Sequence, residues 1–455
     1  ICGPYRIQDV EIEALGVVTN KTPIGAYRGF GQPEATFPLE RMVDIAAVRL
    51  GLDPADLRRR NLVRPQEMPY QIATGLFLDS GRYTELLDLT LQQLDYARVK
   101  NEVAAAQAQG RRLGVGIAFY IEVTNVGPSG LMRLLGVQAS GFDTSTVRVE
   151  PSGHVRVLTG QTPMGQGVET ILAQACADEL GVLLEHVSVS YGDTLSSPYT
   201  GYASGGSRAA GVAGSSVVLT AQRVREKMRK VAAHLLKADV HEVEALPGAF
   251  QVRGKPEQQV TFAEVAKAGY IAVSLPEGLE PGLEATYAYD PPSFAVAYGV
   301  IAVVVEVSPE TGQVTIRRIV FGHDCGKQLN PAIVRGQILG GVAQGIGAAL
   351  YESLDYDNDG QPLVRTLSDF LMPTATEVPD VEFVHLETPP PVSVNGAKGA
   401  GESGIIAMPA AIINAIQDAL GPDAPLITAT PIWPETILAA LNVAAGARAD
   451  LLTDV

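Results

Sequence analysis

Glycine is the residue that most constrains how this chain can fold. The sequence of 455 residues contains 47 glycines, above the usual share of roughly 7%. They follow no collagen-like period, so they must serve tight turns and places where the backbone comes close to another group. An apolar share of 46% gives ample material for a hydrophobic core, which excludes disorder as the overall state.

Charge and metal-ligand content narrow the possible functions. The net charge is −16, from 34 basic and 50 acidic side chains, which makes nucleic acid and anionic membranes poor electrostatic partners. The three cysteines, Cys2, Cys176 and Cys325, predict a reducing, cytoplasmic compartment, and they cannot supply the roughly four thiolates of an iron–sulfur cluster. The six histidines have no HxxxH spacing, so we expect no zinc or di-iron site made by protein side chains.

Apolar periodicity and turn residues predict an α+β fold with mixed sheets and packed helices. Residues 294–305 are largely β-branched and apolar, which is typical of a buried strand. No uncharged apolar run reaches the roughly 18 residues of a membrane span. Further strands are expected at 10–19, 114–124, 145–150, 154–159 and 314–321. Helices are expected at 35–50, 169–180 and 331–350, within 80–109, and in segments that begin at 54, after 404 and at 434.

Two features describe how these elements are organised. The order strand, glycine-rich turn and helix occurs at 155–180 and again at 314–350, which predicts a duplicated subdomain. Residues 127–143 read as a loop-like insert and 240–290 as a peripheral section. In the helix expected at 35–50, the apolar stripe that should face the core consists of Leu39, Met42, Val43, Ala46 and Leu50.

Four glycine-centred segments that also carry polar side chains are the candidates for chemistry. The sequence has neither GxGxxG after a strand nor the Walker A order of glycine and lysine. Glycine-rich turns let backbone N–H groups reach an anion or a flat polar ring. One such segment is most simply a turn, whereas four in one chain predict a cradle for a large polar cofactor. The segments are residues 26–32, 163–167, 203–208 and 398–404.

Glu402 is the residue with the sharpest catalytic signal. It lies among Gly399, Gly401 and Gly404 and precedes the strongly apolar stretch 405–411. A carboxyl group in a tight turn beside a buried helix is expected to have a raised pKa and can act as a general base. The alternative is a glutamate at a helix entry that interacts with the helix dipole.

Together these motifs resemble the molybdopterin-binding large subunit of the xanthine oxidase family of molybdenum hydroxylases. The resemblance covers nearly the whole chain and depends on the joint order of the motifs. They are YRGFGQPE at 27–34, MGQG at 164–167, LNPA at 329–332 followed by GQ at 336–337, and GAGE at 399–402. The resemblance implies that residues 1–105 end a first molybdopterin-binding domain. Residues 106–455 would form a second, with subdomains at 106–290 and 291–455.

The resemblance also implies a cofactor and a set of site residues. The cofactor would be molybdopterin with its molybdenum, in the cytosine dinucleotide form, and no protein side chain would ligate the metal. Glu402 would be the catalytic base, while Tyr27 and Phe30 would contact the substrate. The residues implied in cofactor binding are Arg28, Gly29, Gly165, Gln166, Gly167, Ser207, Arg208, Gln337, Lys398, Gly399 and Gly401.

The implied activity is oxidation of an aldehyde or hydroxylation of an aromatic N-heterocycle with water as the oxygen source. Electrons would pass to 2Fe–2S and FAD subunits on partner chains, and the N-terminal half of the large subunit would be supplied separately. The carbon monoxide dehydrogenases of the family carry a cysteine in the loop that here contains Gly29 and Phe30, which disfavours carbon monoxide as substrate. The alternatives are a non-catalytic structural or cofactor-holding half, a subunit like that of carbon monoxide dehydrogenase, and a glycine-rich α/β enzyme with a chance likeness.

Overall fold

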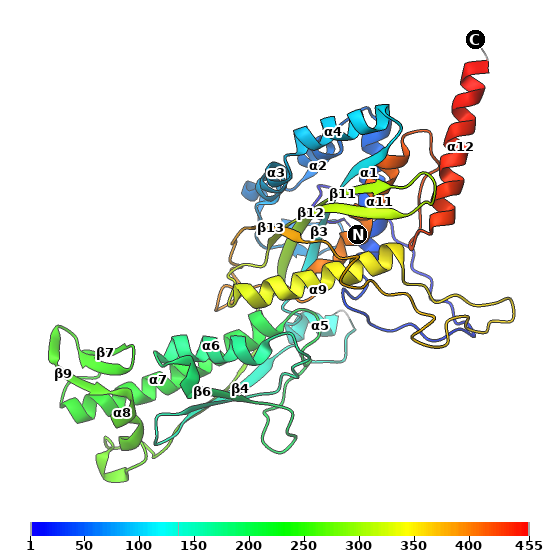
Figure 1. Ribbon diagram of the computed structural model, residues 1–455. Coiled ribbons are helices and arrows are strands. Elements are labelled where there is room, and N and C mark those ends of the chain that lie inside the picture. The colour runs from blue at the N-terminus through cyan, green and yellow to red at the C-terminus, as the bar shows by residue number, and fades with distance from the viewer. Residues whose placement is uncertain (1, 135, 454–455) are drawn as a thin grey trace.

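The computed structural model describes residues 2–134 and 136–453. The fold consists of two lobes (Figure 1), and each lobe is built around a four-stranded mixed sheet. The strand order is β3–β11–β12–β13 in one sheet and β10–β4–β5–β6 in the other. The bounds are β3 (Arg112–Thr124), β4 (Asp143–Val149), β5 (Val155–Thr159), β6 (Val187–Ser190), β10 (Leu283–Tyr289), β11 (Ala295–Val307), β12 (Val314–Asp324) and β13 (Val381–His385).

The two sheets share one pairing pattern, which confirms the expected duplication. Each has two antiparallel pairings followed by a parallel one. In both lobes a helix joins the two parallel strands: α6 (Val168–Leu180) runs between β5 and β6, and α9 (Pro331–Leu350) between β12 and β13. The glycine-rich turns therefore lie at the carboxyl ends of β5 and β12, where ligands of mixed α/β sheets commonly bind.

Strand β11 forms the centre of the larger core because both its faces are covered. Ile301, Val303 and Val305 face the side with α9, α10 (Ser403–Ile406) and α11 (Met408–Leu420). The alternate residues Val300 and Ala302 face the side with α3 (Tyr83–Leu94) and α4 (Tyr96–Ala108). A strand covered on both faces is apolar throughout, which confirms the strand expected at 294–305.

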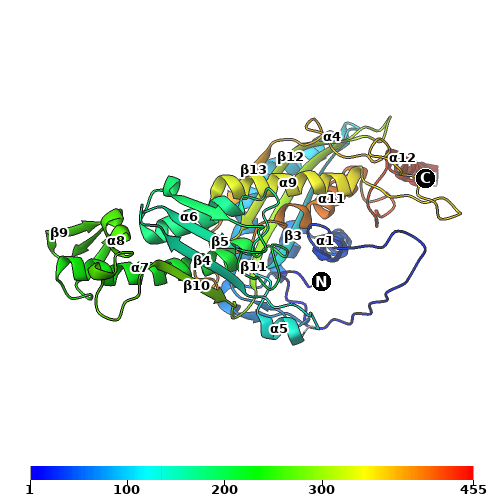
Figure 2. The same cartoon turned by 90° about the horizontal axis from the view of Figure 1, so that it is seen from below.

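The second lobe has its own core of buried side chains between its sheet and the long helix α7 (Gly214–Leu236). A small antiparallel sheet at residues 243–261 lies at its far end (Figure 2), in agreement with the peripheral section expected at 240–290. The end of that section is not peripheral, because residues 283–289 form β10 of the lobe's main sheet. The remaining elements are α1 (Gln32–Arg49), α2 (Pro54–Asn61), β1 (Tyr70–Gln71), β2 (Phe77–Leu78), α5 (Ser129–Leu134), β7 (Val243–Leu246), β8 (Ala249–Val252), β9 (Lys255–Thr261), α8 (Phe262–Ala268) and α12 (Pro434–Thr453).

The strand expected at 10–19 is wrong. These residues form an extended segment that is exposed throughout, with Val18 98% exposed. A strand needs a neighbour for its backbone hydrogen bonds, and no described strand pairs with this segment. The expected insert at 127–143 is only partly a loop, because α5 forms inside it.

The apolar stripe predicted for α1 is only partly correct, although the helix itself is confirmed. Leu39 and Val43 pack against a hydrophobic core. Met42 and Leu50 are 61% and 64% exposed, while Glu40 and Asp44 are buried. The buried face of α1 instead binds Arg58 of α2, whose guanidinium lies 2.8 Å from Glu40 and 3.2 Å from Asp44. Buried ion pairs can reverse the face that apolar periodicity predicts.

The single helical segment expected within 80–109 is divided into α3 and α4 at Asp95, which adopts the left-handed conformation with φ 56°.

Residues 403–420 have the length and apolar composition of a membrane span, but 89% of this stretch is buried inside the structure. It is the helix pair α10 and α11 of the larger core.

Candidate functional site

The loop at residues 26–31 turns sharply into α1 and exposes two aromatic rings. Gly29 and Phe30 have φ values of 97° and 45°. A Cβ atom on Gly29 would lie 2.6 Å from Cγ of Pro33, so both the backbone conformation and the space exclude a side chain there. The rings of Tyr27 and Phe30 are 55% and 65% exposed, which leaves both predicted substrate-binding residues accessible.

Arg28 joins this loop to two distant parts of the chain. Its Nε donates to the carbonyl of Gly401 at 2.6 Å, and its Nη2 donates to the carbonyl of Gln337 at 2.8 Å. Its Nη1 donates to Oε1 of Gln344 at 2.9 Å, and the Gln344 amide donates to the hydroxyl of Tyr27 at 2.8 Å. The structure thus brings Arg28, Gln337 and Gly401 together, as the sequence predicted.

Glu402 lies directly before α10, next to this arginine. Its Oε2 atom is buried and forms no hydrogen bond of normal geometry with any described residue. Burial raises the pKa of the Glu402 carboxyl, while a backbone hydrogen bond from Gly29 and the charge of Arg28 act in the opposite direction. A carboxyl group with a raised pKa and a free oxygen has the properties of a general base.

Glu122 of β3 is a second buried carboxyl beside Glu402, and the sequence analysis missed it. It is fully buried and accepts a hydrogen bond from the hydroxyl of Ser403. Burial and the nearby Glu402 carboxylate raise the pKa of Glu122, and the hydroxyls of Ser207 and Ser403 partly oppose this. Two close carboxyl groups cannot both ionise easily, and the deeper burial of Glu122 favours its neutral form over that of the half-buried Glu402.

Ser207 connects the segment 203–208 to this carboxyl pair. Its backbone carbonyl lies 1.9 Å from where a Cβ atom of Gly399 would stand, so the two glycine-rich segments meet backbone to backbone. Its hydroxyl lowers the pKa of both Glu122 and Glu402. The predicted cofactor residues Ser207, Gly399 and Gly401 are therefore neighbours of the predicted base.

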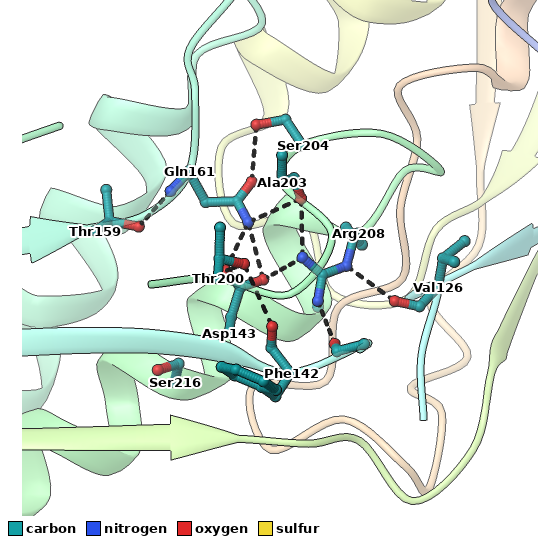
Figure 3. A network of polar contacts seen from close by, with 12 residues as sticks. Val126, Phe142, Asp143, Thr159, Gln161, Thr200, Ala203, Ser204, Arg208 and Ser216 are labelled. Atoms are coloured by element: carbon teal, nitrogen blue, oxygen red, sulfur yellow. Dashed lines mark hydrogen bonds and ion pairs between the residues drawn. The ribbon is translucent and has the colours of Figure 1, made fainter. Parts of the chain in front are cut away.

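Arg208 is completely buried, and its guanidinium is committed to protein groups (Figure 3). It forms an ion pair with Asp143 at 2.5 Å. It also donates to the carbonyls of Val126 at 2.9 Å, Ala203 at 2.8 Å and Gly141. Arg208 thus holds the segment 203–208 against the start of β4, and its direct contact with a cofactor stays a prediction.

The segment 163–167 leads from β5 into α6 and borders α9. A Cβ atom on Gly167 would lie 2.7 Å from Cδ1 of Ile333 on α9. The side-chain oxygen of Gln166 accepts a hydrogen bond from the backbone of Met164 at 2.5 Å. Gly165 has φ 92° and no atom within 4 Å of a Cβ position, so its backbone is openly accessible.

Lys398 is buried at the start of the segment 398–404, which also contains Glu402. Its Nζ lies 3.6 Å from Oδ1 of Asp324 and 5.0 Å from the centre of the Tyr298 ring. Its backbone N–H donates to the carbonyl of Cys325 at 2.7 Å. The lysine charge therefore faces the interior of the larger lobe, and its predicted contact with a cofactor stays a prediction.

Three of the glycine-centred segments, 26–32, 163–167 and 398–404, contact α9. The fourth, 203–208, contacts 398–404 through Ser207 and Gly399. The sequence predicted this convergence without showing its geometry. Glu122 was missed because it lies inside a strand that otherwise reads as apolar, between Ile121 and Val123. A charged residue at a core-facing position of a strand was the available signal. Gln344 was missed because no pattern distinguishes it from other polar residues of α9.

This fold and these loops define a molybdopterin-binding protein. The chain belongs to the molybdopterin cofactor-binding domain family: residues 89–379 match one domain of this family, and residues 1–62 match another.

Particular relatives support the same class. The chain is 38% identical to the nicotine 6-hydroxylase large subunit of Paenarthrobacter nicotinovorans, over 96% of this chain and 53% of that protein. It is 38% identical to the carbon monoxide dehydrogenase large chain of Hydrogenophaga pseudoflava, over 89% of this chain and 50% of that one. The structure of quinoline 2-oxidoreductase from Pseudomonas putida 86 superposes with a TM-score of 0.92 at 39% identity, over 97% of this chain and 56% of that chain. The chain therefore spans about half the length of these relatives.

The residues present fit a molybdopterin cofactor. Gly165 and Gly336 have no atom within 4 Å of a Cβ position, so a large group can approach their backbone closely. The N-terminus of α6 has no side-chain cap, and such an end favours an anionic group such as a phosphate. The unpartnered Oε2 of Glu402 supplies a proton acceptor beside the same loops.

Proposed function

We propose that this chain is the catalytic, molybdopterin-binding part of a molybdenum hydroxylase. It would oxidise an aldehyde or hydroxylate an aromatic N-heterocycle, with water as the source of oxygen. The observation that carries this proposal is the buried carboxyl oxygen of Glu402, which forms no hydrogen bond of normal geometry and lies beside the loop of Arg28 and the segment of Ser207. A general base at that place can take the proton that water must lose during hydroxylation.

Different segments of the chain would bind the cofactor and position the loops around it. Backbone N–H groups of residues 163–167 and of the start of α6 would bind the pterin and its phosphates. The cytosine dinucleotide form is proposed from the likeness to the carbon monoxide dehydrogenase large chain. Arg28 holds the loop of Phe30 and the loop of Glu402 at a fixed distance through Gly401 and Gln337. When bound, the molybdenum cofactor supplies the redox chemistry, taking two electrons from the substrate.

Phe30 supports a flat substrate. Its ring is exposed beside the loop of Glu402, and an aromatic ring can stack on a planar heterocycle. The names of two relatives, nicotine 6-hydroxylase and quinoline 2-oxidoreductase, agree with such a substrate. Carbon monoxide is disfavoured, because Gly29 has no room for the cysteine of the carbon monoxide dehydrogenases.

The electrons would leave through partner chains that carry 2Fe–2S and FAD. Within the described residues the three cysteines are free and buried, and they are too few to hold a cluster. The other partner would be the remainder of the large subunit, since the relatives are about twice as long. A cytoplasmic location follows from the reduced cysteines and is part of the same proposal.

Replacing Glu402 by Gln tests the catalytic role. The amide keeps the size of the side chain but cannot accept a proton, so we expect kcat to fall by about 10²–10⁴-fold, as for loss of a general base, at unchanged molybdenum and pterin content. The matched control is Glu257→Gln on the exposed strand β9, which should keep full turnover. Retained turnover in Glu402→Gln with intact cofactor would instead favour a non-catalytic, cofactor-holding half.

A further inference from the structure

A second cluster of side chains, formed by His323, Cys325 and His385, has the composition of a metal site. One potential ligand atom from each residue lies within 4.8 Å of the others. His323 lies in β12 and Cys325 directly follows the last residue of that strand, and extended backbone places side chains two residues apart on one side. His385 is the direct partner of His323 in the parallel pairing of β12 and β13. The register of the sheet therefore brings all three to one face.

Three ring nitrogens of this cluster form no hydrogen bond of normal geometry with any described residue. His323 and Cys325 are only 4% and 3% exposed, and Cys325 forms no disulfide. Nδ1 of His323 and both ring nitrogens of His385 are buried without a hydrogen bond of normal geometry to any described residue. Each buried polar atom left without a partner costs about 1–3 kcal/mol, and a bound ion would remove this cost for several atoms together.

We infer that His323, Cys325 and His385 bind one zinc ion. A thiolate and two imidazoles favour zinc over magnesium or calcium, which prefer oxygen ligands. Zinc bonds of about 2.0 Å to nitrogen and about 2.3 Å to sulfur place ligand atoms slightly closer together than they lie here, so small side-chain rotations complete the site. This zinc would be separate from the molybdenum, which the pterin carries.

Glu387 is the candidate for a fourth ligand. Its Oε1 lies 3.7 Å from Nε2 of His385, and its side chain is 53% exposed and therefore free to move. A carboxylate oxygen commonly completes a zinc site that already has nitrogen and sulfur ligands. Sequence spacing did not reveal this site, because the ligands come from two strands that are distant in the chain.

The place of the cluster gives the zinc a positioning role. The carbonyl of Cys325 accepts a hydrogen bond from the backbone N–H of Lys398 at 2.7 Å, and Gly326 pairs with Ala397. The ion would thus hold the turn after β12 against the segment that leads to Glu402. It would stabilise the geometry of that loop without contacting the substrate.

Metal analysis of the purified protein with its partner chains tests this inference. After dialysis against a weak chelator, we expect about one zinc per copy of this chain by mass spectrometry of the elements. Cys325→Ser and His385→Gln should each lower the zinc content at least tenfold, with folding verified by circular dichroism. Cys176→Ser is the matched control, because Cys176 is also a buried free thiol but lies in α6, and its zinc content should equal that of the wild type.

Cobalt substitution provides a second measurement that does not depend on activity. The wild type loaded with Co²⁺ should show a thiolate-to-cobalt charge-transfer band, and Cys325→Ser should lose it. Hydrogen exchange at residues 396–402 should become faster in Cys325→Ser and stay unchanged in Cys176→Ser. A wild type without zinc and without the cobalt band would overturn the inference, as would a zinc content that Cys325→Ser leaves unchanged.

Discussion

At the scale of single residues, the central feature is the pair of buried carboxyl groups of Glu122 and Glu402. Glu402 could be predicted, because its position between glycines and an apolar helix is visible in the sequence. Glu122 could not be assigned, since its role depends on the strand register that places it beside Ser403. In the proposed mechanism Glu402 accepts a proton, while the more deeply buried Glu122 keeps its own.

The pH dependence of stability tests the protonation state of Glu122. Its pKa is raised in the folded protein, so the folded state binds more protons than the unfolded state between the ordinary pKa of glutamate and the raised value. Stability from this group is complete at low pH and decreases as pH rises through that window, by at most about 1.4 kcal/mol per pH unit. Glu122→Gln should remove this decrease.

Thermal unfolding followed from pH 5 to pH 8 makes the comparison. We expect the Tm of Glu122→Gln to fall less over this range than that of the wild type, while Glu257→Gln should follow the wild type. Parallel profiles of wild type and Glu122→Gln would mean that Glu122 is ionised in the folded protein.

At the scale of elements, most helices and strands followed from sequence patterns, and the exceptions have physical causes. The stripe of α1 was only partly correct, because Met42 and Leu50 are exposed while Glu40 is buried in an ion pair with Arg58, and apolar periodicity does not register partners on another helix. The strand at 10–19 failed because no described strand pairs with it. Strand β11 was found because burial on both faces leaves a continuous apolar run.

The crossing of α9 and α10 is an element-level contact that depends on glycine. A Cβ atom on Gly404 would lie 2.3 Å from the carbonyl of Ile338 and 2.8 Å from Cα of Gly341. Gly404→Ala should therefore destabilise the protein by about 1–3 kcal/mol, as overpacking does. Gly336→Ala, on the open side of α9, should instead stabilise it by up to about 1 kcal/mol. Urea unfolding measures both, and equal effects would contradict the close crossing.

At the scale of the whole molecule, the two lobes are versions of one plan with separate cores. The sequence predicted the duplication from the order of strand, turn and helix. It did not show that β3 and β10 complete the two sheets from positions outside these units. Long-range pairings of this kind are fixed by tertiary packing, which local patterns do not contain.

Separate cores predict separate thermal transitions. Met228 is buried in the core of the second lobe and Ile412 in that of the first. Met228→Ala and Ile412→Ala should each cost about 2–5 kcal/mol, and each should lower a different transition in differential scanning calorimetry. If both variants shift one common transition equally, the lobes unfold as a single cooperative unit.

The hydrogen bonds of Arg28 also determine when the site can exist during synthesis. Its partners lie 309, 316 and 373 residues later in the chain. A ribosome that has made only the first lobe's early helices has therefore not yet supplied the groups that hold this arginine. The cofactor loops come together only after Gly401 has left the ribosome, so the site cannot form while only its first glycine-rich segment has been made. A molybdopterin that binds these loops can therefore enter only after the segment that contains Gly401 has been synthesised, because Arg28 has no other way to join that segment to its own loop.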